Sequence, residues 1–397
     1  MSIYKDAVSI QNQLFGYRKD LHRIPELGLN LPMTAEYIEK ALREMGYEPK
    51  RVGGCGITAS IGKEGGKCFM LRGDMDALPV QELTDLEYKS LNGNMHACGH
   101  DCHKASMLGA AQLLKMHEAE LDGMVKFMFQ PAEETMEGAA MMIEEGILEN
   151  PKVDAALGLH IFTGMPFPAG TVAMMGADGI FAAVDWFTVH IKGVGCHGAM
   201  PNRGVDPINV MAHILISLQT INSREMDPAD NIVLTIGQAH SGSTSNVIPP
   251  DAMISGTLRT VKNETRAEVK KRMEAIVSGV AATFMAEAYI EWGSGCPVLE
   301  NDRQLHEELK SYLREIDGVK VMDYSENGPA YKTMVSEDFA YIAGNVPSTY
   351  LLISGGCPEE GYCFSQHHPM AKFDDSSIPV AASVYAQSAI RWLSEHK

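Results

Sequence analysis

The stretch FMLRGDMDALP, residues 69–79, places two carboxylates directly after an apolar run. Its first three residues are typical of a short buried strand, and Gly73 interrupts that pattern just before Asp74 and Asp76. The spacing therefore predicts that both carboxylates lie at the C-terminal end of a strand. Because ligands of open α/β sheets bind outside the carboxyl ends of the strands, this edge is where we expect a functional site.

Other apolar runs also end in side chains that can bind a metal or move a proton. VKFMFQPAEE ends in Glu133 and Glu134, and VDAALGLHI delivers His160. A later run, TYLLI, is followed beyond two glycines by His367 and His368, and the pattern does not distinguish between these two histidines as ligands. The sequence thus predicts that several strands of one sheet end at a common site.

HACGHDCH, residues 96–103, is the densest cluster of metal-binding side chains. It holds three histidines, two cysteines and an aspartate. Cys sulfur and His nitrogen are softer donors than the oxygen ligands that Mg²⁺ or Ca²⁺ prefer, so this composition favours a transition metal. We expect a helix to begin near Asp101, which can cap it, with its N-terminal dipole facing the site.

Length and charge limit the classes of function. At 397 residues the chain exceeds the length at which a single core stops growing, so we expect two domains. The net charge of −18 argues against nucleic acid and anionic membranes and favours small molecules or further copies of the chain as partners. The sequence shows neither a long apolar run nor a signal peptide, which predicts a cytoplasmic protein.

Strand and helix signals alternate from residue 34 to about 180, as in a doubly wound α/β sheet. From residue 181 the order becomes β-α-β-β-α-β, which is typical of a ferredoxin-like sandwich. The predicted elements of this second part are strands at 186–192, 231–238, 252–260 and 289–292 and helices at 207–221 and 264–288. We therefore expect a catalytic domain of residues 1–181 and 295–397, interrupted by a lid or dimerisation domain of residues 182–294.

Nine segments, in this order, resemble the M20 metallopeptidase family: HRIPELGL from His22, RGDMDALP from Arg72, HACGHDCH from His96, FQPAEE from Phe129, GLH ending at His160, GVGCHGAMPNRGVDP from Gly193, SNVIPPDAMISGTLR from Ser245, SEDFA from Ser336 and HHP from His367. Within that family they resemble the amidohydrolase branch of N-acyl-amino-acid deacetylases, hippurate hydrolases and plant auxin-conjugate hydrolases. The resemblance implies a phosphorylase/hydrolase-like catalytic domain with an inserted α+β lid.

The resemblance also implies a dinuclear metal site. Its ligands would be Cys98, His100, Glu134, His160 and His367, with Cys98 as the bridge between the ions. Two divalent transition metal ions are expected, with Mn and Zn favoured and Co or Ni also compatible with these donors. A thiolate ligand would make the site sensitive to oxidation.

Glu133 is the candidate general base. A metal-bound water has a pKa near neutrality, and a carboxylate beside it can pass its proton to a leaving amine. Asp76 would orient a ligand by a hydrogen bond, and Asp74 is a weaker candidate for the same task. By resemblance, His197 in a glycine-rich segment would donate to the developing oxyanion, and Asn246 and Arg259 would hold the substrate carboxylate.

The expected function is hydrolysis of the amide bond of an N-acyl amino acid or a similar small conjugate. A dipeptidase or aminopeptidase of the same family would need an acidic group for the free amine of its substrate. A catalytically silent metal-binding protein would have no use for Glu133, and the C-x-x-x-C spacing of Cys98 and Cys102 does not match redox C-x-x-C chemistry. A homodimer or homotetramer through the lid is expected, and the sequence leaves open whether His197 serves its own chain or a partner.

Overall fold

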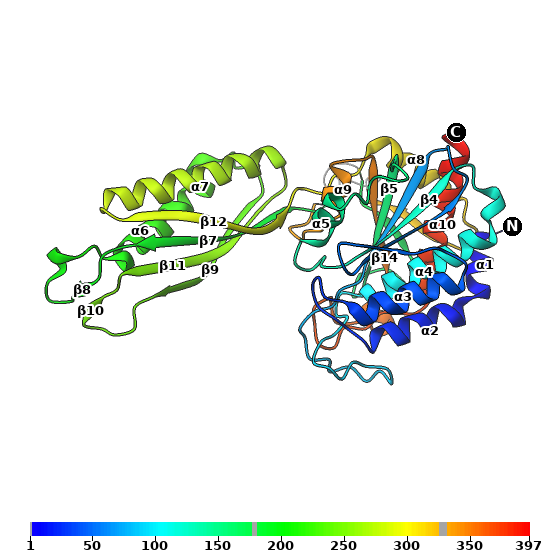
Figure 1. Cartoon of the computed structure of the whole chain (residues 1–397), viewed down its shortest axis with the longest axis horizontal. Coiled ribbons are helices and arrows are strands. Elements are labelled where there is room, and N and C mark those ends of the chain that lie inside the picture. The colour runs from blue at the N-terminus through cyan, green and yellow to red at the C-terminus, as the bar shows by residue number, and fades with distance from the viewer. Residues whose placement is uncertain (1, 177–180, 325–331) are drawn as a thin grey trace. The chain divides into compact units, whose positions relative to one another are not determined.

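The computed structural model describes residues 2–176, 181–324 and 332–397 (Figure 1). These form two units, each with its own hydrophobic core. Unit 1 is made of Met1–Ile180, Glu300–Tyr331 and Asp338–Lys397, and unit 2 of Phe181–Leu299 and Lys332–Glu337. The boundary expected at residue 294 falls inside a strand of unit 2, β12 (Glu287–Cys296).

Unit 1 is built on a mixed sheet that contains eight strands among the described residues, in the order β1-β2-β4-β3-β5-β14-β6-β13. The strands are β1 (Lys50–Val52), β2 (Gly56–Gly62), β3 (Cys68–Asp74), β4 (Met124–Gln130), β5 (Ala155–Phe162), β6 (Val172–Met174), β13 (Val321–Asp323) and β14 (Ser348–Ser354). The large mixed α/β sheet expected from the alternating pattern is confirmed.

The central strands of this sheet fix the place of the candidate site. Strand β3 runs parallel to β4 and β5, and β5 runs parallel to β14. Their carboxyl ends therefore meet at one edge, where Asp74 pairs with Gln130. The segments that follow this edge carry Asp76, Glu133 and Glu134, and His160 lies near the end of β5.

Helices pack around the sheet of unit 1. They are α1 (Ile3–Ser9), α2 (Gln11–His22), α3 (Pro32–Glu44), α4 (His100–Met116), α5 (Gly138–Glu144), α8 (Arg303–Arg314), α9 (Ala340–Ala343) and α10 (Ser377–Glu395). Helices α4 and α10 pack against each other and against β3, and most of their residues are buried because neighbouring helices cover them on the outside. None of the described helices combines the length and apolar composition needed to cross a membrane.

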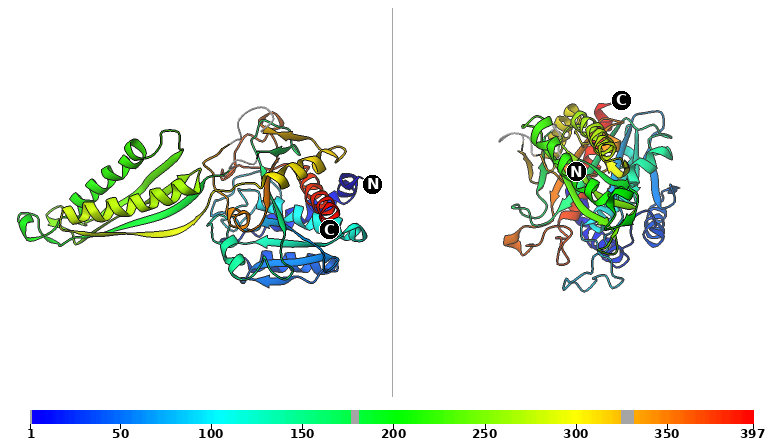
Figure 2. Two further views of the ribbon diagram at one scale, coloured as in Figure 1. Left: turned by 90° about the horizontal axis from the view of Figure 1, so that it is seen from above. Right: turned by 90° about the vertical axis from the view of Figure 1, so that its left-hand side faces the viewer.

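In its described residues, unit 2 is a sandwich of a four-stranded antiparallel sheet and two helices, with a further pair of short antiparallel strands. Its elements are β7 (Ala183–Lys192), β8 (Cys196–His197), α6 (Pro207–Thr220), β9 (Ile232–Ser241), β10 (Val247–Ile248), β11 (Asp251–Thr260), α7 (Asn263–Thr283) and β12. The sheet order β12-β7-β11-β9 and the connection β-α-β-β-α-β are ferredoxin-like. Figure 2 shows both helices on one face of this sheet.

Helix α7 ends earlier than the pattern predicted. The sequence indicated a helix through Ala288, whereas the structure ends α7 at Thr283 and begins β12 at Glu287. Met285 adopts a left-handed backbone with φ 62°, and the amide of Ala286 bonds back to the carbonyl of Ala281. This geometry terminates a helix. The apolar spacing continued past it because the following strand is also half-buried.

The two ends of the long segment of unit 2, Phe181 and Leu299, are neighbours. Phe181 and Leu299 form an antiparallel bridge, and the amide of Leu299 donates to the carbonyl of Phe181. Next to this bridge, β7 and β12 pair as antiparallel neighbours from Val184 opposite Cys296 onward. The ends of the long segment 181–299 are therefore held together within unit 2.

Candidate metal centre

A glycine turn positions two of the predicted ligands. Gly99 has φ 88°, and a Cβ at this position would meet the ring of Phe373 at 2.8 Å, so only glycine fits here. The turn places Cys98 just before α4 and makes His100 the first residue of the helix. Both side chains are buried and lie at the helix N-terminus.

Asp101 does not cap α4, contrary to expectation. The N-cap residue is Gly99, without a side-chain cap, and the carboxylate of Asp101 instead faces the outer helix α2. It accepts from Arg18 Nε at 3.0 Å and lies 2.9 Å from His22 Nδ1. These partners arise from residues far upstream, so the sequence around Asp101 carried no sign of them.

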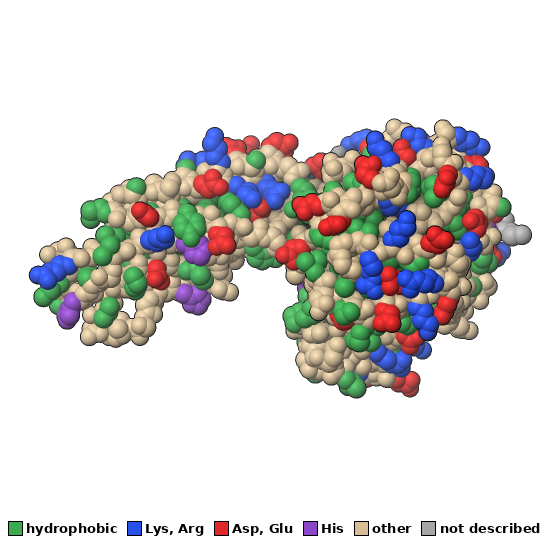
Figure 3. Space-filling view, viewed as in Figure 1, with side chains coloured by type: hydrophobic (Ala, Val, Ile, Leu, Met, Phe, Trp, Pro, Cys, Tyr) green, Lys and Arg blue, Asp and Glu red, His purple; other side chains and the backbone are tan. Residues whose placement is uncertain are grey.

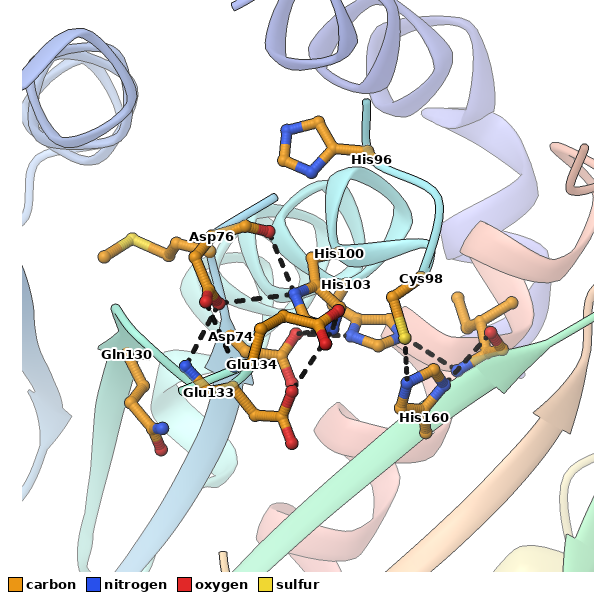
Figure 4. A network of polar contacts seen from close by, with 12 residues as sticks. Asp74, Asp76, His96, Cys98, His100, His103, Gln130, Glu133, Glu134 and His160 are labelled. Atoms are coloured by element: carbon orange, nitrogen blue, oxygen red, sulfur yellow. Dashed lines mark hydrogen bonds and ion pairs between the residues drawn. The ribbon is translucent and has the colours of Figure 1, made fainter. Parts of the chain in front are cut away.

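The thiol of Cys98 lies between two histidines from distant parts of unit 1. Its Sγ atom is 3.3 Å from Nε2 of His160 and 3.3 Å from Nε2 of His367. The same Nε2 of His367 is 3.5 Å from Oε1 of Glu134. Figure 4 shows Cys98, His100, His160 and Glu134 pointing toward one another.

Hydrogen bonds set the tautomers of two of these histidines. Nδ1 of His100 lies 2.9 Å from the carbonyl oxygen of Asp76, and Nδ1 of His160 lies 3.1 Å from that of Ile161. A carbonyl accepts only, so Nδ1 is the donor in both rings and Nε2 of the neutral ring is left with its lone pair. Nε2 of His100 is buried and, among the described residues, has no hydrogen-bond partner.

Glu133 lies beside this cluster, on a segment whose backbone amides are hydrogen-bonded. Its side chain is 7% exposed, and one carboxylate oxygen is 3.8 Å from Nε2 of His100. Asp76 holds the backbone here, because its two oxygens accept from the amides of Glu133 and Glu134 at 3.2 and 3.1 Å. Asp76 thus orients His100 through its main-chain carbonyl and the two glutamates through its side chain.

The electrostatics of the cluster favour a bound cation. Burial raises the pKa of Glu134 to about 7, and burial together with Glu134 and Glu133 raises the pKa of the Cys98 thiol well above its usual value. Burial opposes the charged form of His100, but Asp74, Asp76 and Glu134 outweigh it and raise its pKa to about 10. The raised pKa values mean that, without a metal ion, bound protons reduce the repulsion between the thiolate and the carboxylates. A divalent ion would reduce the same repulsion.

The donor set also fits two metal ions. Candidate ligand atoms of Cys98, His100 and His160 lie within 4.8 Å of one another, and so do those of Cys98, Glu134 and His367. Sulfur and nitrogen ligands of one tetrahedral zinc ion would lie roughly 3.6 Å apart, close to the separations around Cys98. Cys98 belongs to both groups, as a bridging ligand must.

The structure distinguishes the two histidines that the sequence left open. His367 reaches Cys98 and Glu134, whereas His368 is exposed and its ring stacks on Phe364 at 4.3 Å between centroids. His367 has φ 65°, a strained backbone for a residue with a side chain. Its exposed ring marks the side on which the cluster opens to solvent.

Unit 2 brings His197 and Asn246 together. His197 lies on the short strand β8 opposite Val247 of β10, and the amide of Gly198 donates to the carbonyl of Asn246. Both side chains are exposed, and β8 and β10 form one end of unit 2 (Figure 1). Figure 3 shows histidine side chains on the surface of this unit.

Arg259 lies elsewhere in unit 2. It is near the far end of β11, and its guanidinium donates to the carbonyl of Met334 and to Oγ of Ser336 at 3.1 Å. The strand from Asp251 to Arg259 spans about 25 Å, so one copy of unit 2 cannot bring Asn246 and Arg259 to the same carboxylate. The predicted extent of this strand already implied the separation.

The family model described as peptidase family M20/M25/M40 matches residues 70–391. The chain belongs to peptidase family M20. This M20 chain is 37% identical to N-acetyl-L-cysteine deacetylase of Bacillus subtilis over 98% of its length and 90% of the relative. It is 32% identical to hippurate hydrolase of Campylobacter jejuni over 99% of its length and 100% of the relative.

A solved M20 structure has the same fold. It is a Bacillus subtilis protein described as a dinuclear metal binding peptidase, and it superposes with a TM-score of 0.80 and 32% identity over 98% of this chain and 99% of its own. The expected family and the expected fold class are confirmed by these matches.

Sequence reasoning about this M20 chain missed a buried hydrogen-bond network around Lys104 of α4. Lys104 is fully buried, and its ammonium donates to the carbonyl of Met75 and to Nε2 of His96, both at 2.8 Å. Burial lowers the pKa of Lys104 to about 8. Lys104 therefore ties the segment after β3, which carries Asp76, to the turn that carries Cys98. A lysine among apolar and small residues of a central helix was the available signal.

Proposed function

We propose that the protein is a dinuclear metal amidohydrolase that cleaves the amide bond of N-acyl amino acids or similar small conjugates. The observation that carries this proposal is the placement of Cys98 between two groups of candidate ligands, with the buried carboxylate of Glu133 beside them. The names of the relatives, which include a deacetylase of N-acetyl-L-cysteine and a hippurate hydrolase, support the substrate class.

Five residues would hold the metal ions: Cys98, His100, Glu134, His160 and His367. Cys98 is the proposed bridge, and manganese or zinc suits this mixture of thiolate, imidazole and carboxylate, with cobalt and nickel also compatible. Bound divalent ions would supply a Lewis acid for the amide carbonyl and lower the pKa of a water molecule.

Glu133 is the proposed general base and acid. Its carboxylate would accept a proton from the water molecule that attacks the amide carbonyl. It would then give this proton to the amide nitrogen, which leaves as an amine. Asp76 contributes by fixing the backbone of Glu133 through its hydrogen bond to that amide. The glutamate is thereby held in place before a substrate arrives, which is what positioning for catalysis requires.

Unit 2 is the proposed lid. His197 would donate a hydrogen bond to the oxyanion, and Asn246, its neighbour, would contact the substrate. Arg259 remains a candidate for the substrate carboxylate, but its separation from Asn246 means that two copies of unit 2 would have to share such a site. This supports a homodimer through unit 2.

A substrate panel tests the proposal. The purified chain, loaded separately with Mn²⁺, Zn²⁺, Co²⁺ or Ni²⁺, would be offered N-acetyl, N-benzoyl and long-chain acyl amino acids together with dipeptides that carry a free amine. We expect release of the free amino acid from at least one acyl class, and release at least about 100-fold slower from the Glu133→Gln protein prepared in parallel. Preferential cleavage of the dipeptides would identify a peptidase instead, and no hydrolysis with any metal would refute the proposal.

A further inference from the structure

His103 lies three residues after His100 on α4 and is fully buried. Both of its ring nitrogens are engaged (Figure 4). Nε2 lies 2.8 Å from the backbone nitrogen of Ile161, and Nδ1 lies 2.5 Å from Oδ1 of Asp74. The ring thus connects α4 to two strands of the sheet.

These two partners determine the tautomer of His103. A backbone amide only donates, so Nε2 must present its lone pair to the N–H of Ile161. A neutral imidazole that accepts at Nε2 carries its proton on Nδ1, which then donates to the carboxylate of Asp74. Although His103 belongs to HACGHDCH and lies near other candidate ligands, it has no lone pair left for a metal ion.

The contact with Ile161 occurs where one side of the sheet ladder stops. Pairing of β3 with β5 runs to Arg72 and ends opposite Gly158, while β5 continues to Phe162. The buried N–H of Ile161 lies in this continuation, and a buried backbone amide needs a partner. The side chain of His103 supplies it directly beside His160.

Asp74 is itself held from behind. Its second oxygen accepts from the guanidinium of Arg72 at 2.7 Å, and Arg72 also donates to Gln130 and Asp338, each at 2.9 Å. All four side chains are fully buried. The carboxylate therefore has a fixed orientation, and so has the ring that donates to it.

We propose that His103 is a positioning residue that holds the end of β5, and with it His160, in the place that metal binding requires. The inference rests on the proposed function, in which His100 and His160 are ligands. Because α4 carries both His100 and His103, this bond links the ligand on the helix to the ligand on the strand. Removing the outer partners of metal ligands typically lowers metal affinity 10- to 100-fold.

Three variants test this role through metal affinity. With Zn²⁺ as the probe in competition with a chelator, His103→Ala should bind about 10- to 100-fold more weakly than the unaltered chain. His103→Gln should recover most of the affinity, because its amide oxygen can reach the N–H of Ile161. His117→Ala, at the other end of α4, is the matched control and should bind normally. Normal affinity in a folded His103→Ala protein would overturn the inference.

Two measurements complete the test. In the unaltered chain labelled with ¹⁵N-histidine, we expect His103 to carry its proton on Nδ1 with and without Zn²⁺, and the amide of Ile161 to exchange slowly with solvent. A proton on Nε2, or a spectral sign of Zn²⁺ on this ring, would contradict the assignment. If His160→Ala loses Zn²⁺ while His103→Ala binds Zn²⁺ with normal affinity, only the positioning role is rejected. If His160→Ala retains Zn²⁺ fully, the proposed ligand set itself is rejected.

Discussion

The Sγ atom of Cys98 lies 3.3 Å from Nε2 of His160, although Cys98 lies just before α4 and His160 lies on β5. A thiol this close to an imidazole lone pair shares either a proton or a metal ion with it. Since Cys98 also lies 3.3 Å from His367, its removal affects the candidate ligands on both sides.

Replacing Cys98 by alanine should therefore empty or scramble both metal positions, because a bridging ligand serves both ions. Metal content per chain, measured by elemental analysis after dialysis, is the readout. Cys363→Ala, which removes an exposed thiol, should keep the full content. Two equivalents still bound to Cys98→Ala would remove this residue from the ligand set.

Replacing Glu133 by glutamine should leave metal content intact and lower turnover by at least about 100-fold, because the amide cannot accept a proton. Glu137→Gln changes an exposed carboxylate in the same segment and should leave turnover near normal. The assignment of Glu133 as general base fails if Glu133→Gln turns over at a near-normal rate.

His197→Ala should lower the maximal rate without changing metal content or folding, since the proposed contact forms with the transition state. His213→Ala, another exposed histidine of unit 2, serves as the control. Mixing Glu133→Gln chains with His197→Ala chains then tests sharing between subunits. Regained activity would show that His197 serves a partner chain, and continued inactivity after verified subunit exchange would place it in the same chain as its metals.

Metal affinity should rise with pH. The pKa of Cys98 is raised when no ion is bound, first by burial and then by Glu134 and Glu133, so a metal ion must displace the thiol proton. At pH values below that raised pKa, each displaced proton weakens apparent affinity about tenfold per unit fall in pH. Calorimetry in buffers of different ionisation enthalpy would count the protons released. Affinity that is constant between pH 6 and pH 8 would contradict this.

Arg18→Leu should destabilise the metal-free protein by about 3 kcal/mol or more, because it leaves the buried carboxylate of Asp101 without its arginine. Arg18 is 1% exposed and donates to Asp101 at 3.0 Å. Arg23→Leu breaks only an exposed pair with Asp20 and should change stability by less than about 1 kcal/mol. Urea unfolding at neutral pH compares the two variants, and equal losses would mean that the buried pair contributes nothing special.

The sequence predicted the edge of the sheet where the candidate site lies. Asp74 and His160 both come at the ends of apolar runs, and parallel strands bring such ends together. The position of Cys98 beside His160 could be inferred only through the family resemblance, because nothing in either segment encodes the distance between them.

Other features depend on contacts between remote segments, and the local pattern could not reveal them. His100 and His103 look equivalent within HACGHDCH, yet one faces the cluster and the other bonds to the backbone of β5. His103 can accept from the amide of Ile161 because the pairing of β3 with β5 ends at Gly158, and strand propensity does not encode where that pairing ends. The position of Asp101 near the start of a predicted helix favoured a capping role. The structure differs because Asp101 bonds to Arg18 in a separate helix, which the local sequence does not reveal.

The bridge between Phe181 and Leu299 bears on how the chain folds. When a domain contains a long flexible insertion, bringing together the parts of the chain on either side of it costs conformational entropy. This cost grows with the length of the insertion. If unit 2 folds by itself, its bridged ends stand about 5 Å apart, which is the spacing of paired residues on neighbouring strands. Once unit 2 has folded, residues 181–299 act as a short connection within the chain. They then add little to the entropy cost of pairing β5 with β14.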